Sequence, residues 1–134
     1  EILRPTFKQP LIHFAINCAA LSCPPLSPQP YRSETLIEQL VTSTRQALAQ
    51  DAWLKIEEET LRVTAILNWF GEDFTTEYAH GVTANSSYRD RAILGLIARY
   101  GPPAAQAIAR VPNTRIRFLT YDWSLNDVTD TGRQ

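Results

Sequence analysis

The first third of the chain combines a short apolar segment with a proline-rich stretch. Residues 11–17 alternate and include β-branched and aromatic side chains, a pattern that predicts a mostly buried strand. Residues 24–30 contain four prolines, which excludes a helix interior or a central strand there. Residues 1–10 predict the tail of a helix and a connector bounded by prolines. We therefore expect a strand that ends near residue 17, followed by a loop.

Apolar residues at helical spacing predict the main helices further along the chain. Residues 34–50 form the clearest case, with Ser33 as the N-cap. Residues 88–100 follow a variant of the capping box, and a Gly-Pro-Pro stop then permits a helix over 103–110. Residues 66–74 predict a short helix, and residues 75–86 a polar loop. Aromatic side chains of that short helix are predicted to be core: Trp69, Phe70 and Phe74.

Two more segments predict strands. Residues 54–65 predict a hairpin or a single strand, and residues 114–121 predict a strand with one solvent-exposed face. Helices separate strands that are too few and too irregular for a doubly wound sheet, so the predicted class is α+β. The polar residues 127–134 predict a frayed tail.

Length and charge narrow the classes of function. The chain has 134 residues, which predicts a single domain over 1–134. Its formal net charge of −1 gives no electrostatic reason to expect a nucleic acid or an anionic membrane as partner. No apolar run approaches the length of a membrane-spanning segment. No signal peptide is visible and the chain does not begin with Met, so periplasmic, secreted and cytoplasmic locations all stay open.

The end of the predicted first strand holds the candidate chemistry. Cys18 is a thiol close to a histidine, which is a typical position for a nucleophile that needs a base and a group to orient the base. The chain offers two bases and three orienting groups: His13, His80, Asp122, Asn126 and Asn17. On an extended strand His13 and Cys18 point to opposite faces, so their pairing requires the strand to end or bulge before Cys18. A His13–Asp122 pair is easier, because each residue lies on or beside a predicted strand.

The same residues also have purely structural interpretations. Cys18 and Cys23 are consistent with small buried side chains, or with one disulfide in an exported protein. His13 is consistent with a hydrogen-bonded core histidine, and His80 with simple exposure. A Cys-x4-Cys pair with a distant histidine is not a zinc-binding spacing, and nothing resembles a phosphate-binding loop. We expect neither a metal nor any other cofactor.

Four blocks of sequence resemble one protein family, in the right order. They are Ile-Leu-Arg-Pro at 2–5, Ile-His-Phe-Ala-Ile-Asn-Cys-Ala-Ala-Leu-Ser-Cys-Pro-Pro-Leu at 12–26, Asn-Trp-Phe at 68–70 with Asp-Phe at 73–74, and Tyr-Asp-Trp-Ser-Leu-Asn at 121–126. Through these blocks the chain resembles, from residue 1 to about 126, the family catalogued as domain of unknown function 547. The resemblance implies a small sheet with flanking helices, distantly like papain and transglutaminases.

The resemblance also implies an activity and its residues. It suggests a cysteine hydrolase of peptide or amide bonds, including those of small thiol peptides such as glutathione, with Cys18 as thiol beside His13 and Asp122. In the family the position of Cys23 can be serine. Family members carry a further upstream segment that ends in an Ile-Glu-His block. The chain therefore resembles the C-terminal portion of such a domain, with that upstream segment as a partner and its histidine as a second candidate for the base.

Two functions from different classes follow. In the first, Cys18 attacks the amide of a small peptide substrate, and backbone amides of the turn 19–23, which includes Ser22, stabilise the oxyanion. Asn17, Cys23 and Asn126 support this site. In the second, the chain is a non-catalytic module that binds a peptide or a partner protein through a groove beside residues 11–17. Cys18, Cys23 and His13 are then structural.

Overall fold

Helices make up most of the regular secondary structure, and they are joined to a small sheet. The computed structural model describes residues 3–83 and 86–127. The helices are α1 (Leu3–Phe7), η1 (Pro10–Phe14), η2 (Ser33–Thr35), α2 (Leu36–Leu48), α3 (Ala65–Phe70), η3 (Gly71–Phe74), α4 (Thr75–Tyr78), α5 (Tyr88–Tyr100) and α6 (Pro103–Ala109), where η marks a 3₁₀ helix. The strands are β1 (Leu54–Glu57), β2 (Thr60–Val63) and β3 (Arg115–Phe118). The predicted α+β class is confirmed. The predicted frayed tail, 127–134, lies outside the described residues apart from its first residue.

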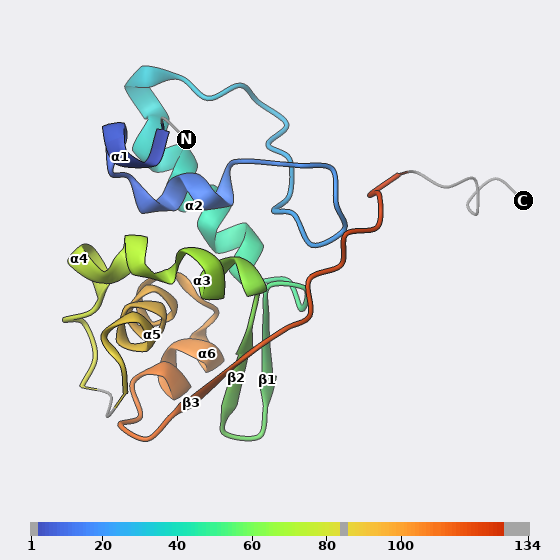
Figure 1. The fold of residues 1–134 in the computed structure, drawn as a ribbon. Coiled ribbons are helices and arrows are strands. Elements are labelled where there is room, and N and C mark those ends of the chain that lie inside the picture. The colour runs from blue at the N-terminus through green and yellow to red at the C-terminus, as the bar shows by residue number, and fades with distance from the viewer. Residues whose placement is uncertain (1–2, 84–85, 128–134) are drawn as a thin grey trace, which may run out of the picture.

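The sheet has the order β1-β2-β3. Strands β1 and β2 form the antiparallel hairpin that the sequence allowed, with Leu54 opposite Val63. Strand β3 pairs with β2 in parallel, with Val63 opposite Phe118. A parallel pair needs a long crossover, and the helices α3 to α6 provide it. After β3 the chain continues past the sheet toward the loop that follows η1 (Figure 1).

The core lies where α5 meets its neighbours. Helix α5 buries apolar side chains almost all round, and Ile93, Leu94, Leu96 and Ile97 are fully buried. The Ser87 side chain accepts a hydrogen bond from the Asp90 amide, so the predicted cap of this helix is confirmed. Helices α1 and η1 lie on one side of the α3–η3–α4 segment, and α5 and α6 lie on the other (Figure 1). The core extends through that segment, because Leu11 and Phe14 of η1 belong to the same buried cluster as Phe74 and Ile93.

The predicted strand over 11–17 is wrong, because residues 10–14 form the 3₁₀ helix η1. Pro10 fixes a helical φ at the first position, and the Gln9 side chain accepts a hydrogen bond from the Leu11 amide at 3.1 Å. Leu11 and Phe14 are both buried and lie three residues apart, which places them on one face of a 3₁₀ helix. The short apolar segment therefore satisfied a strand pattern and a helical pattern equally well.

Two other predictions need smaller corrections. The predicted loop over 75–86 begins with the helical turn α4, where Tyr78 packs against α5. Trp69, predicted to be core, is half-exposed, whereas Phe74 is fully buried as expected. The predicted helices over 34–50, 88–100 and 103–110 are confirmed to within a few residues. No helix in the described ranges is long and apolar enough to cross a membrane.

Candidate functional site

The loop after η1 is held in a fixed shape by Asn17. Its side-chain oxygen accepts a hydrogen bond from the Ala19 amide at 2.7 Å, and its side-chain NH₂ donates to the Pro24 carbonyl at 2.8 Å. Ala19 has a φ of 63°, in the left-handed region that residues other than glycine seldom adopt. Asn17 thus closes the loop across its base, and the next residue, Cys18, is exposed.

Cys18 and Cys23 form a disulfide. Of the alternatives that the sequence left open, the disulfide is therefore the state of this structure, and neither sulfur carries a free thiol in it. The Cys18 amide donates to Cys23 Sγ at 3.0 Å. The Tyr121 hydroxyl lies 3.4 Å from Cys18 Sγ and 3.3 Å from Cys23 Sγ. A disulfide sulfur has no proton to give, so the hydroxyl is the donor.

The C-terminal segment pairs with this loop through its backbone. The Leu21 amide donates to the Ser124 carbonyl at 2.8 Å, and the Ser22 hydroxyl accepts a hydrogen bond from the Asp122 amide at 2.8 Å. The Asn126 amide donates to the Ala19 carbonyl at 2.7 Å. The structure thus brings the predicted residues Ser22, Asp122 and Asn126 together, but their main chains make most of these contacts.

Asp122 does not orient His13, which corrects the pairing expected from the sequence. Its carboxylate accepts a hydrogen bond from the Ser124 amide at 2.9 Å within its own turn. Hydrogen bonds from the Ser124 hydroxyl and amide hold the pKa of Asp122 below its ordinary value. The carboxylate is therefore ionised at neutral pH and is occupied by a local turn on the exposed C-terminal segment.

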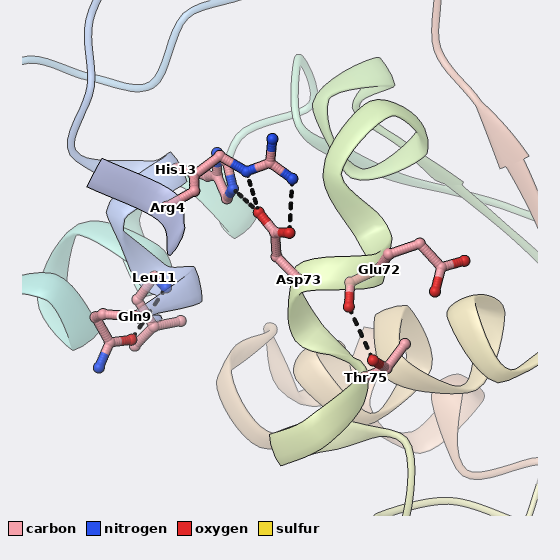
Figure 2. Close-up of polar contacts among 7 residues, drawn as sticks. All are labelled: Arg4, Gln9, Leu11, His13, Glu72, Asp73 and Thr75. Carbon is pink, nitrogen blue, oxygen red and sulfur yellow. Dashed lines mark hydrogen bonds and ion pairs between the residues drawn. The ribbon is translucent and has the colours of Figure 1, made fainter. Parts of the chain in front are cut away.

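Asp73 is the carboxylate that His13 contacts. Figure 2 shows the Asp73 side chain reaching from η3 toward His13 and Arg4. His13 Nε2 lies 2.8 Å from Asp73 Oδ2, and Arg4 donates to both carboxylate oxygens, at 2.5 and 2.7 Å. The Arg4 hydrogen bond, with a smaller effect from His13, lowers the pKa of Asp73. The buried His13 ring also stacks on Phe70, with ring centroids 4.5 Å apart.

Sequence reasoning missed Asp73 as a partner of His13. The residue did stand in one of the blocks that carried the family resemblance, so a signal was present. An extended segment over 11–17 would have directed His13 differently, whereas η1 turns it toward η3. The contact thus depends on the one element that the sequence pattern misassigned.

A pocket of about 600 Å³ connects these features. His13 and Arg4 line it beside the Cys18–Cys23 disulfide, and the remaining lining is apolar or aromatic: Ile12, Ile16, Pro24, Ile66, Trp69, Phe70, Tyr121 and Trp123. Three of these rings pack together, with Trp69 5.1 Å from Tyr121 and Tyr121 4.5 Å from Trp123 between centroids. Trp123 remains 69% exposed and Trp69 47% exposed. We call these three rings the aromatic wall.

The pocket contains Cys18 and His13 without joining them. Among the described residues no hydrogen bond links the two side chains, because His13 Nε2 is bound to Asp73 and Cys18 Sγ is bound to Cys23. His80 lies on the surface, 2.8 Å from the Tyr88 hydroxyl, and does not line this pocket. Of the two bases that the sequence offered, His13 alone is at the candidate site.

The predicted oxyanion turn is largely occupied. The amides of Ala19, Leu21, Ser22 and Cys23 already donate to acceptors within the protein. A substrate oxygen would have to compete with those acceptors. In this state the turn therefore holds the loop together and has few donors left to offer.

Comparison with known proteins gives one family. Residues 2–48 match the model of the family described as "Protein of unknown function, DUF547". No curated protein and no solved structure matches the chain. The matched segment contains Arg4, His13 and both cysteines, while Asp73 and the aromatic wall lie beyond it. The match supports the resemblance seen in the sequence, and it shows no likeness to papain.

Proposed function

We propose that this chain, which belongs to the DUF547 family, is a binding module whose pocket takes an apolar or aromatic segment of a peptide or partner protein. The proposal rests on one observation: the two tryptophan rings of the aromatic wall remain largely exposed to solvent and line an apolar pocket of about 600 Å³. That volume lies in the range of ordinary ligand sites. The other pocket residues then provide shape and orientation.

Trp123 and Trp69 expose apolar surface that a ligand in the pocket would cover. Large indole rings are costly to leave in water, and covering apolar surface gains about 25 cal/mol per Å². Each of these rings already packs on its neighbours, so a ligand meets a surface with little side-chain freedom left to lose. Tryptophan and tyrosine are also the residues that most often dominate binding energies at interfaces.

Two polar side chains also line the pocket. Arg4 and His13 are held by Asp73 and border the same space. Ligand pockets commonly pair apolar walls with a few fixed polar groups that set orientation. The ligand expected here is therefore a short peptide with a bulky apolar side chain, whose backbone faces the Arg4–Asp73–His13 cluster.

Replacement of Trp123 by alanine tests this function. We expect short peptides with a central Trp-Leu pair to bind wild type, and peptides with Ser-Ser in its place to bind far more weakly, as followed by tryptophan fluorescence and by NMR shift changes. Trp123→Ala should weaken binding at least about tenfold, which is about 1.4 kcal/mol.

Tyr88→Ala is the matched control, because Tyr88 is an exposed aromatic residue outside the pocket. It should leave the affinity unchanged. Equal binding of the two peptides, or equal affinity in Trp123→Ala and wild type, would contradict the proposal.

A second function is favoured by a separate observation: Cys18 is exposed at the pocket that His13 also lines, and His13 contacts Asp73. Once reduced, Cys18 could attack the carbonyl of a peptide or amide bond, with His13 or an upstream histidine as base. The occupied amides of the turn 19–23 make this the weaker of the two candidates, because hydrolysis needs free donors for the oxyanion.

Two cysteine variants separate hydrolysis from binding. Cys23→Ser leaves Cys18 as a permanent thiol and should hydrolyse small peptide amides that carry no thiol, without added reductant. Glutathione, which is itself a thiol, is a probe only for the reduced condition. Wild type should act only after reduction, and Cys18→Ser should be inactive in both conditions. Activity that survives in Cys18→Ser would exclude Cys18 as the nucleophile.

A further inference from the structure

We propose that the Cys18–Cys23 disulfide is an exchange site, at which an external thiolate attacks Cys18 Sγ and Cys23 leaves as the thiolate. The substrate class is a thiol carried on an apolar group, such as a cysteine beside bulky side chains in a peptide. The exchange rests on the disulfide's own surroundings. The preference for apolar carriers rests on the proposed function of the pocket.

Access to the two sulfurs is unequal. Cys18 is exposed, whereas Cys23 is only 8% exposed and its sulfur lies 3.3 Å from the Tyr121 hydroxyl. A thiolate must reach the sulfur that it attacks, so the rate depends on which sulfur is open. Cys18 Sγ is therefore the electrophile in this disulfide.

The contacts of Cys23 make it the leaving group. Its sulfur accepts the Cys18 amide at 3.0 Å and also lies 3.3 Å from the Tyr121 hydroxyl. Hydrogen bonds from these donors stabilise the negative charge that develops on Cys23 when the bond breaks. Burial raises the pKa of Tyr121, so the hydroxyl keeps its proton and remains a donor.

The loop keeps the released sulfur close. Asn17 holds both Ala19 and Pro24, so the two ends of the short loop stay together when the disulfide opens. Cys23 can then attack the mixed disulfide on Cys18 and restore the starting state. A leaving group that is retained in this way is what a reversible exchange site requires.

The exchange reaction needs no reagent other than the external thiols. In the first step RS⁻ forms a bond to Cys18 Sγ, the Cys18–Cys23 bond breaks, and Cys23 takes the electron pair. In the second step another RS⁻ attacks the carrier sulfur of the mixed disulfide, which releases RSSR and the Cys18 thiolate. Two external thiols are oxidised and one protein disulfide is reduced. The proton of each RSH ends on a protein thiol.

The Cys18 side of the disulfide also borders the apolar pocket. Ile16 and Trp123 are both exposed there and line the same space. An apolar group that settles against them holds its thiol near Cys18 and raises its local concentration. Thiols with an apolar carrier should therefore react faster than polar thiols of equal basicity.

The first experiment maps the site of attack on the folded protein. Wild type is treated with 2-mercaptoethanol, quenched with acid, alkylated with N-ethylmaleimide and analysed by peptide mass spectrometry. We expect the mixed disulfide on Cys18 and the maleimide on Cys23, in a ratio of about ten to one or more. An even distribution, a preference for Cys23, or no reduction while the chain stays folded would overturn the proposal.

Two hydroxyl deletions test the role of Tyr121. Tyr121→Phe should slow the opening of the disulfide by about tenfold, because Cys23 loses one of its two donors. Tyr88→Phe removes a hydroxyl that contacts His80 instead and should react like wild type. Equal rates in the two variants, measured below their unfolding transitions, would remove Tyr121 from the reaction.

Single-cysteine variants and a change of thiol complete the test. Cys23→Ser should form a stable mixed disulfide with an added small disulfide such as cystamine, and Cys18→Ser should react much more slowly, since its thiol is the buried one. Rapid reaction of Cys18→Ser would overturn the assignment. Benzyl mercaptan should then open wild type faster than 2-mercaptoethanol at equal thiolate concentration. If the exchange occurs at Cys18 without that preference, the pocket proposal fails and the exchange site stands.

Discussion

At the scale of single residues, Asp73 connects the N-terminal segment to the rest of the molecule. Its carboxylate accepts two hydrogen bonds from Arg4 and also contacts His13 Nε2. Arg4 lies on α1 and His13 on η1, and both helices are far from η3 in sequence. Arg4 also lies over the Phe70 ring, with its guanidinium carbon 4.8 Å from the centroid. Loss of the carboxylate would remove two hydrogen bonds of Arg4 and the Asp73 contact of the buried His13 ring. Removing the acceptor of a buried polar group costs more than the hydrogen bond itself contributes.

Asp73→Asn should therefore destabilise the chain at neutral pH by about 1–3 kcal/mol. The pKa of Asp73 is lower in the folded state than its ordinary value of 3.8. The ionised carboxylate thus stabilises the fold above that value, and the contribution disappears as the pH falls through the folded-state pKa. Urea unfolding at pH 7 and near pH 2 should show a gap between wild type and variant that closes in acid. A gap of equal size at both pH values would show that charge is not its cause.

At the scale of elements, the sequence predicted the long helices well and the first short segment badly. The helices over 36–48 and 88–100 have many apolar positions in phase. Ser87 caps the second helix as predicted, whereas the predicted cap Ser33 is wrong, because Ser33 lies inside the 3₁₀ helix η2 that precedes the first helix. Residues 10–14 are too few for the strand period of two and the helical period to predict different apolar positions. The hydrogen bond between the Gln9 side chain and the Leu11 amide favours the helix. The site shows the same limit. The sequence indicated Cys18, Cys23 and His13, whereas Asp73 and Trp123 depend on long-range packing that no local pattern encodes.

The contact between α4 and α5 gives a prediction for one glycine. A Cβ added to Gly95 would lie 2.0 Å from the Tyr78 carbonyl oxygen, which is backbone and cannot turn aside. Gly95→Ala should therefore destabilise the chain by about 3 kcal/mol, measured by urea unfolding. Gly81 is the matched control, because its Cβ would meet the same oxygen at an ordinary 3.5 Å. Gly81→Ala should stay within about 0.5 kcal/mol of wild type. Similar losses in both variants would contradict the close packing of α4 on α5.

At the scale of the whole molecule, the pocket is built from three distant parts of the chain. Residues of the segment 4–24, of helix α3 and of the segment after β3 all line it. Only the first of these parts falls in the segment that matches the family model. The pocket therefore exists only when the crossover from β2 to β3 has placed Tyr121 and Trp123 beside the N-terminal loop. A ligand that binds there should stabilise the entire fold against unfolding, because the unfolded chain has no such site.

Whether the fold survives reduction decides what the disulfide is for. The bridge joins residues only five positions apart, and closing so short a loop stabilises a protein by about 2 kcal/mol in the chain-entropy view. Domains of this size have a total stability of about 5–15 kcal/mol, and among the described residues neither cysteine belongs to the buried cluster around α5. We therefore expect reduced wild type to remain folded. Urea titrations should show an unfolding free energy that is lower by about 2 kcal/mol with a phosphine reductant than without it.

A double variant, Cys18→Ala with Cys23→Ala, is the control. It should have the stability of reduced wild type, and the reductant should not change it. Unfolding of wild type on reduction alone would mean that the bridge is a structural staple, and that neither exchange nor hydrolysis at Cys18 can occur in a folded chain.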